Sequence, residues 1–275
     1  WMMMIGLIVG TSEGKNILSG LNRFTEDVFI STATAYGAEL LKDYKYKVFN
    51  EKPLDLVGLI EAIAKNDIKI LIDASHPYAL EITENAIEAC KVKGIQYVRY
   101  ERPPVLERFK DNKNVVVVED YESLYTYLKT IDGTILNTTG SRNIDKILNF
   151  NLKNRIIHRM VPSIKILEKL FELGVEVDDI VAMKGPVGYD LNCGFINEYR
   201  AKAILMKDSG VQGGTYDKIK AAIDNNIMAF IIGRKPMEYS KVFYSEVEVV
   251  KYISGLMEVH KWDIKNKDSY FKSCG

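Results

Sequence analysis

The chain has 275 residues, of which 47% are hydrophobic, and its 37 Lys and Arg residues balance 37 Asp and Glu residues. This length can bury a substantial core in one large domain or in two smaller ones. A formal net charge of zero creates no overall field toward nucleic acid or an anionic membrane. We therefore expect neither as a partner, and a charged ligand would have to be bound locally.

The three cysteines, Cys90, Cys193 and Cys274, are far apart and lack the spacing of a zinc site or a disulfide framework. They favour a reducing cytoplasm, and no metal site is predicted. The apolar run at residues 1–9 is too short to span a bilayer and lacks the basic start and cleavage site of a signal peptide. The oligomeric state stays open, with a monomer as the working assumption.

Short apolar runs alternate with helical patterns through the first hundred residues. Leu56, Leu59, Ile60 and Ile63 have the spacing of one helix face. Continuous apolar strands between helices are typical of a parallel sheet covered on both faces, so a doubly wound α/β lobe is predicted. The predicted strands are residues 4–9, 28–31, 47–49, 68–72 and 95–100, and the predicted helices are residues 54–65 and 79–93.

The alternation begins again after Pro103, Pro104 and a polar stretch at residues 110–114, which predicts a second α/β lobe. Its predicted strands are residues 115–118, 134–136, 155–160, 180–183, 203–206 and 228–232, with a helix at 214–225. The predicted organisation is an N-terminal lobe at 1–115, a C-terminal lobe at 116–258 and a frayed polar tail at 259–275.

The first strand ends in a tight glycine turn, Gly10-Thr11-Ser12-Glu13-Gly14, before a helical stripe. A turn that opens a helix leaves backbone N–H groups for a phosphate or another anion, and Ser12 can cap the helix. The spacing does not match the full G-x-G-x-x-G fingerprint. An ordinary strand-to-helix turn is an equally good interpretation of this segment alone.

Residues 73–78 (Asp-Ala-Ser-His-Pro-Tyr) follow the fourth predicted strand and place an acid, a hydroxyl, an imidazole and a phenol in one loop. Ligands of open α/β sheets bind at the carboxyl ends of strands, so Ser75, His76 and Tyr78 are candidate site residues. The structural alternative makes His76 a turn residue before proline, with Asp73 binding backbone donors. His158 and His260 lack such surroundings, and structural roles are predicted for them.

Residues 207–215 (Lys-Asp-Ser-Gly-Val-Gln-Gly-Gly-Thr) form a second glycine-rich loop between a predicted strand and helix. Three glycines and two hydroxyls can bring backbone amides close to a phosphate. Lys218 and Arg234 could flank this loop, although solvated surface positions are the alternative for both. The spacing Tyr216-x-x-x-Lys220 matches short-chain dehydrogenases, but it follows a glycine loop near the C-terminal end, so we reject it as a catalytic pair.

Several motifs in their order and spacing resemble the precorrin-6A reductase family, over about residues 4–255. The motifs are Gly-Thr-Ser-Glu at 10–13, Asp-Ala-Ser-His-Pro-Tyr-Ala at 73–79, Glu-x-x-x-Asn-Ala at 81–86, Tyr-Glu-Arg-Pro at 100–103, Thr-Thr-Gly-Ser-Arg at 138–142, Met-Lys-Gly-Pro at 183–186, Lys-Asp-Ser-Gly at 207–210 and Gly-Arg-Lys-Pro at 233–236. Two departures are Val9 before Gly10, where the family often has two glycines, and Lys184, where another polar residue is more common.

The resemblance implies NADPH-dependent reduction of one carbon–carbon double bond in precorrin-6A or its cobalt form, giving precorrin-6B on the route to cobalamin. It also implies two Rossmann-like lobes with parallel sheets, with the cofactor and the carboxylate-rich macrocycle in an interlobe cleft. His76 and Tyr78 are then candidate catalytic residues, as proton donors or orienters, with water as the alternative donor. Arg102 and Arg142 are candidate ligands of substrate carboxylates.

The residues predicted to bind NADPH come from both lobes and are Gly10, Thr11, Ser12, Glu13, Ser75, Thr139, Gly140, Asp208, Ser209, Gly210, Gly213, Gly214, Thr215, Lys218 and Arg234. Two other functions remain open on sequence alone. One is a non-catalytic dinucleotide-binding sensor, and the other is a short-chain-type dehydrogenase.

Overall fold

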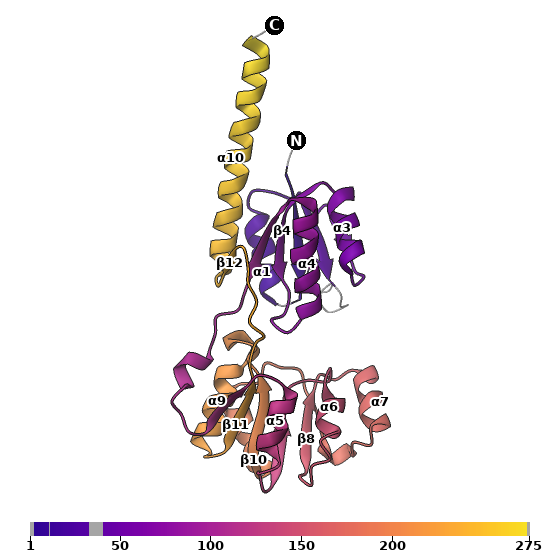
Figure 1. The fold of residues 1–275 in the computed structure, drawn as a ribbon, viewed down its shortest axis with the longest axis vertical. Coiled ribbons are helices and arrows are strands. Elements are labelled where there is room, and N and C mark those ends of the chain that lie inside the picture. The colour runs from indigo at the N-terminus through magenta and orange to yellow at the C-terminus, as the bar shows by residue number, and fades with distance from the viewer. Residues whose placement is uncertain (1–2, 11, 33–40, 274–275) are drawn as a thin grey trace. The chain divides into compact units, whose positions relative to one another are not determined.

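The computed structural model describes residues 3–10, 12–32 and 41–273, with side chains through residue 259. The chain forms two compact units. The first unit contains residues 1–101 and 237–275, and the second contains residues 102–236 (Figure 1). Each unit is built on its own six-stranded sheet, and all strand pairs in both sheets are parallel.

The sheet of the first unit has the order β12-β5-β4-β1-β2-β3. Its strands are β1 Met4–Val9, β2 Val28–Thr32, β3 Val48–Asn50, β4 Ile68–Ala74, β5 Gln96–Tyr100 and β12 Val242–Phe243. From β1 the chain winds outward through β2 to β3, then returns to β4 on the other side of β1 and winds outward again. The strand order therefore reverses between β1 and β4, which makes this a doubly wound sheet.

Helices cover both faces of this sheet. Helices α1 (Ser12–Leu21) and α10 (Glu246–Ser273) pack against each other on one face. The other face carries α3 (Leu56–Lys65) and α4 (Leu80–Lys93), whose buried residues join a separate apolar cluster with Met4 and Ile8 of β1. Because β1 is buried along its whole length, its sequence is continuously apolar.

The sheet of the second unit has the order β6-β11-β10-β7-β8-β9. Its strands are β6 Val115–Val118, β7 Thr134–Asn137, β8 Ile156–Met160, β9 Ile180–Ala182, β10 Ala201–Lys207 and β11 Met228–Ile232. The chain runs outward from β7 to β9 and then returns to β10 on the other side of β7. This sheet is therefore also doubly wound, and its order reverses between β7 and β10.

Alternate residues of the strands in the second unit face different helices. Ala229 and Ile231 join the core under α8 (Tyr189–Glu198) and α9 (Thr215–Asp224), whereas Phe230 between them contacts Tyr127 of α5 (Tyr121–Leu128). The described part of this unit also contains α6 Ile144–Leu148, α7 Ile164–Glu172 and the short 3-10 turns Leu106–Phe109, Val177–Asp179 and Val211–Gly213.

The two units divide the chain differently from the predicted lobes. Residues 102–115 were assigned to the first lobe, but Leu106 and Phe109 pack on the core of the second unit. Residues 237–258 were assigned to the second lobe, but β12 pairs with β5 and α10 packs on the first unit. The predicted frayed tail also differs, because α10 continues as helix to Ser273.

The physical reason for the return to the first unit is an apolar stripe on α10. Val249, Ile253 and Met257 are four residues apart and are at most 4% exposed, in the same cluster as Ile17 and Leu21 of α1. Without α10, the apolar residues of α1 in this cluster would be only partly buried.

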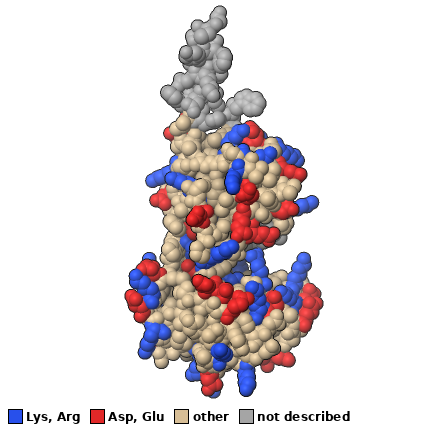
Figure 2. Space-filling view, in the orientation of Figure 1, with Lys and Arg blue, Asp and Glu red and all other residues tan. Residues whose placement is uncertain are grey.

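Charges of both signs are interspersed on the face that Figure 2 shows, as a net charge of zero leads one to expect. Within residues 3–10, 12–32 and 41–273, no helix combines the length and the apolar character that crossing a membrane requires.

Candidate functional site

The reversal point of the first sheet brings together two loops that the sequence had singled out. Gly10 follows β1, and its N–H donates to the carbonyl of Ala74 at 3.4 Å. A Cβ atom on Gly10 would lie 3.1 Å from the backbone nitrogen of His76 and 3.2 Å from the Cα atom of Ser75. The glycine therefore allows the two loops to touch, at the point where open α/β sheets bind ligands.

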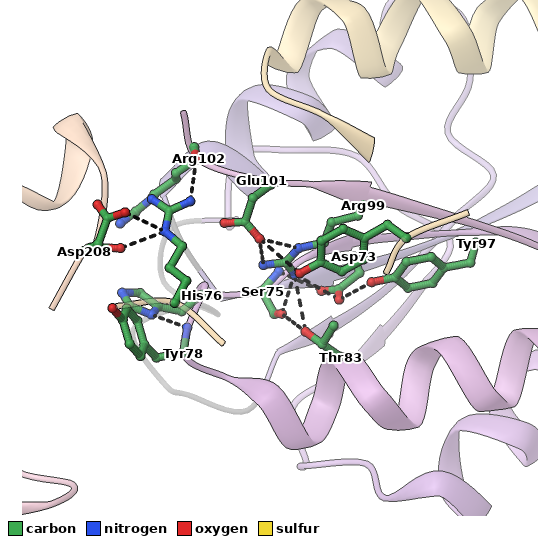
Figure 3. Close-up of polar contacts among 12 residues, drawn as sticks. Asp73, Ser75, His76, Tyr78, Thr83, Tyr97, Arg99, Glu101, Arg102 and Asp208 are labelled. Atoms are coloured by element: carbon green, nitrogen blue, oxygen red, sulfur yellow. Dashed lines mark hydrogen bonds and ion pairs between the residues drawn. The ribbon is translucent and has the colours of Figure 1, made fainter. Parts of the chain in front are cut away.

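A buried polar cluster holds the loop after β4 (Figure 3). The Asp73 carboxylate accepts the N–H of Ser75 at 2.9 Å on Oδ1, and Oδ2 accepts the Tyr97 hydroxyl at 2.8 Å. Arg99 on β5 pairs with Asp73 at 2.9 Å and with Glu101 at 3.0 Å. Asp73 and Arg99 are at most 1% exposed, so this is a charge network inside the sheet.

The same cluster engages the Ser75 hydroxyl, which accepts from Arg99 Nη1 at 2.9 Å and lies 3.2 Å from the Thr83 hydroxyl. Ser75 is 5% exposed. Its side chain therefore anchors the loop to the buried polar cluster. Cofactor contact by this residue stays a prediction.

His76 and Tyr78 extend beyond this cluster and are both half-buried. The N–H of Tyr78 donates to His76 Nδ1 at 3.2 Å, and the two rings lie 6.0 Å apart, centre to centre. Because Nδ1 accepts a hydrogen bond, the neutral imidazole carries its proton on Nε2. This arrangement is compatible with donation of a proton by His76.

The turn after β1 is compact because Gly14 meets the strand. A Cβ on Gly14 would lie 2.6 Å from Val9 Cγ1. Helix α1 begins at Ser12, whose hydroxyl donates to the Glu13 carboxylate at 3.2 Å, and Glu13 is only 2% exposed. A buried carboxylate at this helix start disfavours a second anion there. Thr11, also predicted to bind the cofactor, lies outside the described residues.

The reversal point of the second sheet also brings together two predicted loops. Thr138 follows β7, and its N–H and hydroxyl both donate to the carbonyl of Leu205 on β10, at 2.9 and 2.7 Å. The loop at 138–142 therefore lies beside the loop at 207–215, at the carboxyl ends of two neighbouring strands.

Three loops at these reversal points share one local design. In each, a side-chain oxygen on the last strand residue or next to it accepts an N–H two residues later: Asp73 from Ser75, Asn137 from Thr139 at 3.0 Å, and Asp208 from Gly210 at 3.3 Å. Such a turn fixes the direction in which the following backbone leaves the strand. Gly140 then adopts φ +86°, a conformation that favours glycine.

His158 is structural, in agreement with the sequence. It is 1% exposed, and its Nδ1 lies 3.0 Å from Asn137 Nδ2. Burial lowers the pKa of His158 to about 4, so the ring is neutral and Nδ1 accepts from the amide.

The glycine-rich loop at 207–215 is tightly folded. Gly210 and Gly214 have φ of +74° and +73°, so both positions need glycine. Thr215 starts α9, and its hydroxyl accepts the N–H of Ser209 at 3.0 Å and donates to the carbonyl of Lys207 at 3.2 Å. A Cβ on Gly213 would clash with the Cβ atom of Ser209. The glycines therefore close the loop on itself and bring it to the start of a helix.

Two predicted binding arginines, Arg102 and Arg234, support this loop; Figure 3 labels Arg102 and Asp208. Arg102 is 7% exposed, and its Nη1 donates to the carbonyl of Ser209 at 2.9 Å. Arg234 Nε donates to the carbonyl of Asp208 at 2.9 Å and lies 3.2 Å from its carboxylate, while Nη1 donates to the carbonyl of Arg102 at 2.6 Å. The structure thus gives both arginines a positioning contact, and ligand binding by either stays a prediction.

Further cations lie at the carboxyl ends of the strands in the second sheet, near the loops at 138–142 and 207–215. Lys218 in the first turn of α9 is buried, with 5% exposure, and burial together with Arg159 lowers its pKa to about 7. The pKa of Lys207 at the end of β10 is lowered by burial and by Arg142, which is exposed in the neighbouring loop. The edge therefore carries local positive charge on a chain of zero net charge.

Pro186, the last residue of the motif at 183–186, lies against the loop at 207–215. A Cβ on Gly214 would lie 3.3 Å from Pro186 Cβ and 3.5 Å from the carbonyl oxygen of Val187. The loop before α8 therefore packs against the loop before α9. In the rejected pair, Lys220 forms an ion pair with Asp224, and the Tyr216 ring packs on Phe109.

Sequence reasoning missed Arg99 and Arg159, which are central to the two edges. The available signal was a charged residue inside an apolar strand, in Gln96–Tyr100 and in Ile156–Met160. A cation at such a position needs a partner or a ligand.

The fold and these edges define an α/β protein with two doubly wound units, each of which presents polar loops at its strand-order reversal. The model of the precorrin-6x reductase family (CbiJ/CobK) matches residues 4–254, and the chain belongs to that family. It is therefore an oxidoreductase of cobalamin biosynthesis that needs a reduced nicotinamide cofactor. This assignment favours the predicted reductase over the sensor and the short-chain dehydrogenase.

Curated relatives agree over nearly their full lengths. The cobalt-precorrin-6A reductase of Methanocaldococcus jannaschii is 34% identical over 92% of this chain and 99% of its own. That of Priestia megaterium is 30% identical over 90% and 96%. The precorrin-6A reductase of Mycobacterium tuberculosis is 27% identical over 85% and 89%. Among solved structures, CobK precorrin-6A reductase has the same fold, with a TM-score of 0.74 at 16% identity over 92% of this chain and 97% of its own.

Proposed function

We propose that this protein uses NADPH in the cytoplasm to reduce one carbon–carbon double bond of cobalt-precorrin-6A, giving cobalt-precorrin-6B. The observation that carries the proposal is the gathering of the family motifs at the two reversal points, where Gly10 touches Ser75 and His76 and where Thr138 binds Leu205. The cobalt-containing substrate is favoured because the relatives at 30% identity or more carry that name.

The residues present fit a dinucleotide. At the second edge, a glycine-rich loop, a helix start and the cations Lys218 and Lys207 suit phosphate groups. At the first edge, the buried Glu13 carboxylate suits hydroxyl groups better than phosphate. The phosphates are therefore assigned to the loop at 207–215, and a sugar or the substrate to the loop at 10–13.

Reduction of a double bond adds a hydride to one carbon and a proton to its neighbour, and the reduced nicotinamide supplies the hydride when bound. The protein must hold both reactants in register and deliver the proton. His76 is the assigned donor, since backbone binding at Nδ1 leaves the proton on Nε2, and Tyr78 orients the ring. As Nε2 gives its proton to the carbon, it takes another from water, so that the ring stays neutral. Arg142 and Arg102 are assigned to carboxylates of the macrocycle.

The first experiment follows NADPH oxidation without oxygen by its near-ultraviolet absorbance, together with the visible spectrum of the macrocycle. Cobalt-precorrin-6A and its metal-free form are tested in parallel. Coupled spectral changes with the cobalt form support the proposal, and faster turnover of the metal-free form would reverse the choice of substrate. No change with either form would overturn the proposed function.

The role of His76 is tested with His76→Asn and Tyr78→Phe. If His76 donates the proton, His76→Asn lowers kcat by about 10²-fold or more, with NADPH affinity retained. Tyr78→Phe keeps the backbone N–H that binds Nδ1, so a smaller loss is expected. An unchanged kcat in His76→Asn would assign the proton to water. The interlobe cleft and the monomeric state stay predictions, which a structure with both ligands and sedimentation would test.

A further inference from the structure

Lys218 is a buried cation that forms no ion pair with any of the described residues. Lys218 is 5% exposed, and none of the described residues forms a hydrogen bond or an ion pair with it. The acid that acts on it, Asp208, is engaged elsewhere, with Arg234 at 3.2 Å and with the N–H of Gly210 at 3.3 Å. Burial of an unpaired ammonium is costly, and a bound anion would remove that cost.

Arg159 brings a second cation to the same place. It lies on β8, and repulsion from its guanidinium contributes to the lowered pKa of Lys218. Its Nη1 donates to the Asn192 side-chain oxygen at 3.0 Å, and Asn192 is fixed by bonds of 2.8 Å to the carbonyls of Val187 and Gly188. The hydrogen-bond partner of Arg159 among the described residues, Asn192, is thus neutral. Burial lowers the pKa of Arg159 to about 10. Among the described residues, Asp208 is the acid that acts on Lys218, and it is already paired with Arg234.

The start of α9 adds backbone donors. Its N-cap is Gly214, which has no side chain to accept a hydrogen bond. Among the hydrogen bonds of the described chain, the N–H of Lys218 reaches the carbonyl of Gly214, whereas the N–H groups of Tyr216 and Asp217 have no acceptor. The start of this helix thus presents two open amides and the buried Lys218, with the half-buried Arg159 close enough to act on it, and all of these donors favour an oxyanion.

We propose that Lys218, Arg159 and the first amides of α9 form a phosphate subsite for the nicotinamide dinucleotide, and that phosphate binds there together with a proton. The inference rests on the proposed function and deepens it, because it assigns the cofactor phosphate to this subsite and couples its binding to pH.

The proton follows from the state of Lys218. Its pKa of about 7 means that most molecules of the free protein carry a neutral amine above pH 8. A phosphate dianion beside the amine raises that pKa, so binding takes up close to one proton at such pH. The other charges that act on Lys218 are Arg159, which stays charged in this range, and Asp208, which is ion-paired. The dissociation constant for NADP⁺ should therefore rise by up to about tenfold per pH unit above pH 7.

The test is calorimetric titration of the whole protein with NADP⁺ and NAD⁺, at pH 6 to 9 and in buffers of different ionisation enthalpy. Lys218→Met should weaken NADP⁺ binding by about thirtyfold or more. It should also raise the thermal midpoint of the free protein, because it removes a buried unpaired charge. Lys218→Arg should keep binding at low pH and lose the proton uptake. Lys220→Met, two residues on and paired with Asp224 at the surface, is the matched control and should change neither.

Each outcome has one meaning. Equal weakening of NADP⁺ and NAD⁺ in Lys218→Met assigns the subsite to the pyrophosphate, and selective weakening of NADP⁺ assigns it to the 2′-phosphate. Unchanged NADP⁺ binding with a raised KM for the tetrapyrrole would overturn the phosphate assignment in favour of a substrate carboxylate. If the wild type binds NADP⁺ without proton uptake, the coupling is wrong while the proposed function stands. If the wild type reduces the tetrapyrrole only with another donor, the proposed cofactor fails.

Discussion

Single buried charges decide much of this structure, and Arg99 is the clearest case. It lies inside a parallel sheet and pairs with Asp73 and Glu101, which are 0% and 7% exposed. The Asp73 side chain also fixes the N–H of Ser75 at the reversal point of the first sheet. The charge network therefore connects the stability of the sheet to the shape of a candidate site.

Replacement of Arg99 by Met should destabilise the first unit by about 3–5 kcal/mol, because two buried carboxylates lose their counter-charge. Unfolding in urea, monitored by circular dichroism, measures the change. Lys45→Met is the control, since the pair of Lys45 with Glu26 is exposed to solvent and should contribute nothing measurable. Equal midpoints for the Arg99 variant and the control would show that the network contributes little.

His158 should make stability depend on pH. Its pKa is about 4 in the folded chain because it is buried, and near 6.5 in an unfolded chain. The unfolded chain therefore binds more protons between these values, so this contribution is present above pH 6.5 and is lost as the pH falls toward 4. The difference in unfolding midpoint between wild type and His158→Gln should shrink over that window. A constant difference would mean that the buried ring titrates normally.

At the scale of single residues, the sequence predicted local backbone geometry wherever the residue type itself favours one conformation or position. Glycine in a tight turn, as at Gly10, and a polar group at a strand end, as at Ser75, were both recognisable. Arg102 and Arg234 are predicted to bind ligands, which stays a prediction, and the structure adds that each bonds to the backbone of the loop at 207–215. Which side chain an arginine reaches depends on contacts between distant segments, and local sequence does not encode them.

At the scale of elements, α10 is held to the first unit by a close helix contact. A Cβ on Gly20 of α1 would lie 2.5 Å from Val250 Cγ2 of α10, so glycine sets the approach of the two helices. The stripe Val249, Ile253 and Met257 completes the packing.

The Gly20→Ala substitution should lower stability, because overpacking costs about 1–3 kcal/mol and exceeds the gain in helix propensity. The Gly255→Ala substitution in α10 meets nothing within 4 Å and should instead stabilise by up to about 1 kcal/mol. Thermal unfolding and amide exchange of α10 measure both. Adding Val250→Ala to Gly20→Ala should restore the docking, and failure to do so would place the strain elsewhere.

At the scale of the whole molecule, the second unit is one continuous segment inserted into the first. Residues 102–236 have their own sheet and core, whereas residues 1–101 need β12 and α10 from residues 237–275. The N–H groups of Arg99 and Glu101 on the β5 side bind the carbonyls of Lys241 and Phe243 at 2.8 and 2.9 Å, which joins the returning chain to the sheet.

Residues 102–236 alone should therefore fold cooperatively, and residues 1–101 alone should not. Joining residue 101 to residue 237 through a short glycine-serine linker should restore a folded first unit. Far-ultraviolet circular dichroism and cooperative urea unfolding check the three chains. A stable fold of residues 1–101 alone would show that β12 and α10 are dispensable.

The sequence by itself determined the α/β class, the two parallel sheets and the loops at which chemistry is expected, because buried strands are read from continuous apolar runs and strand ends from glycine and polar residues. Only the tertiary structure decided that β12 and α10 return to the first unit, that Arg99 and Arg159 are central, and that Lys218 is buried with no ion-pair partner in the described part of the chain. These facts depend on packing between segments far apart in the chain. An amphipathic helix or a lone arginine is compatible with several partners until the fold selects one.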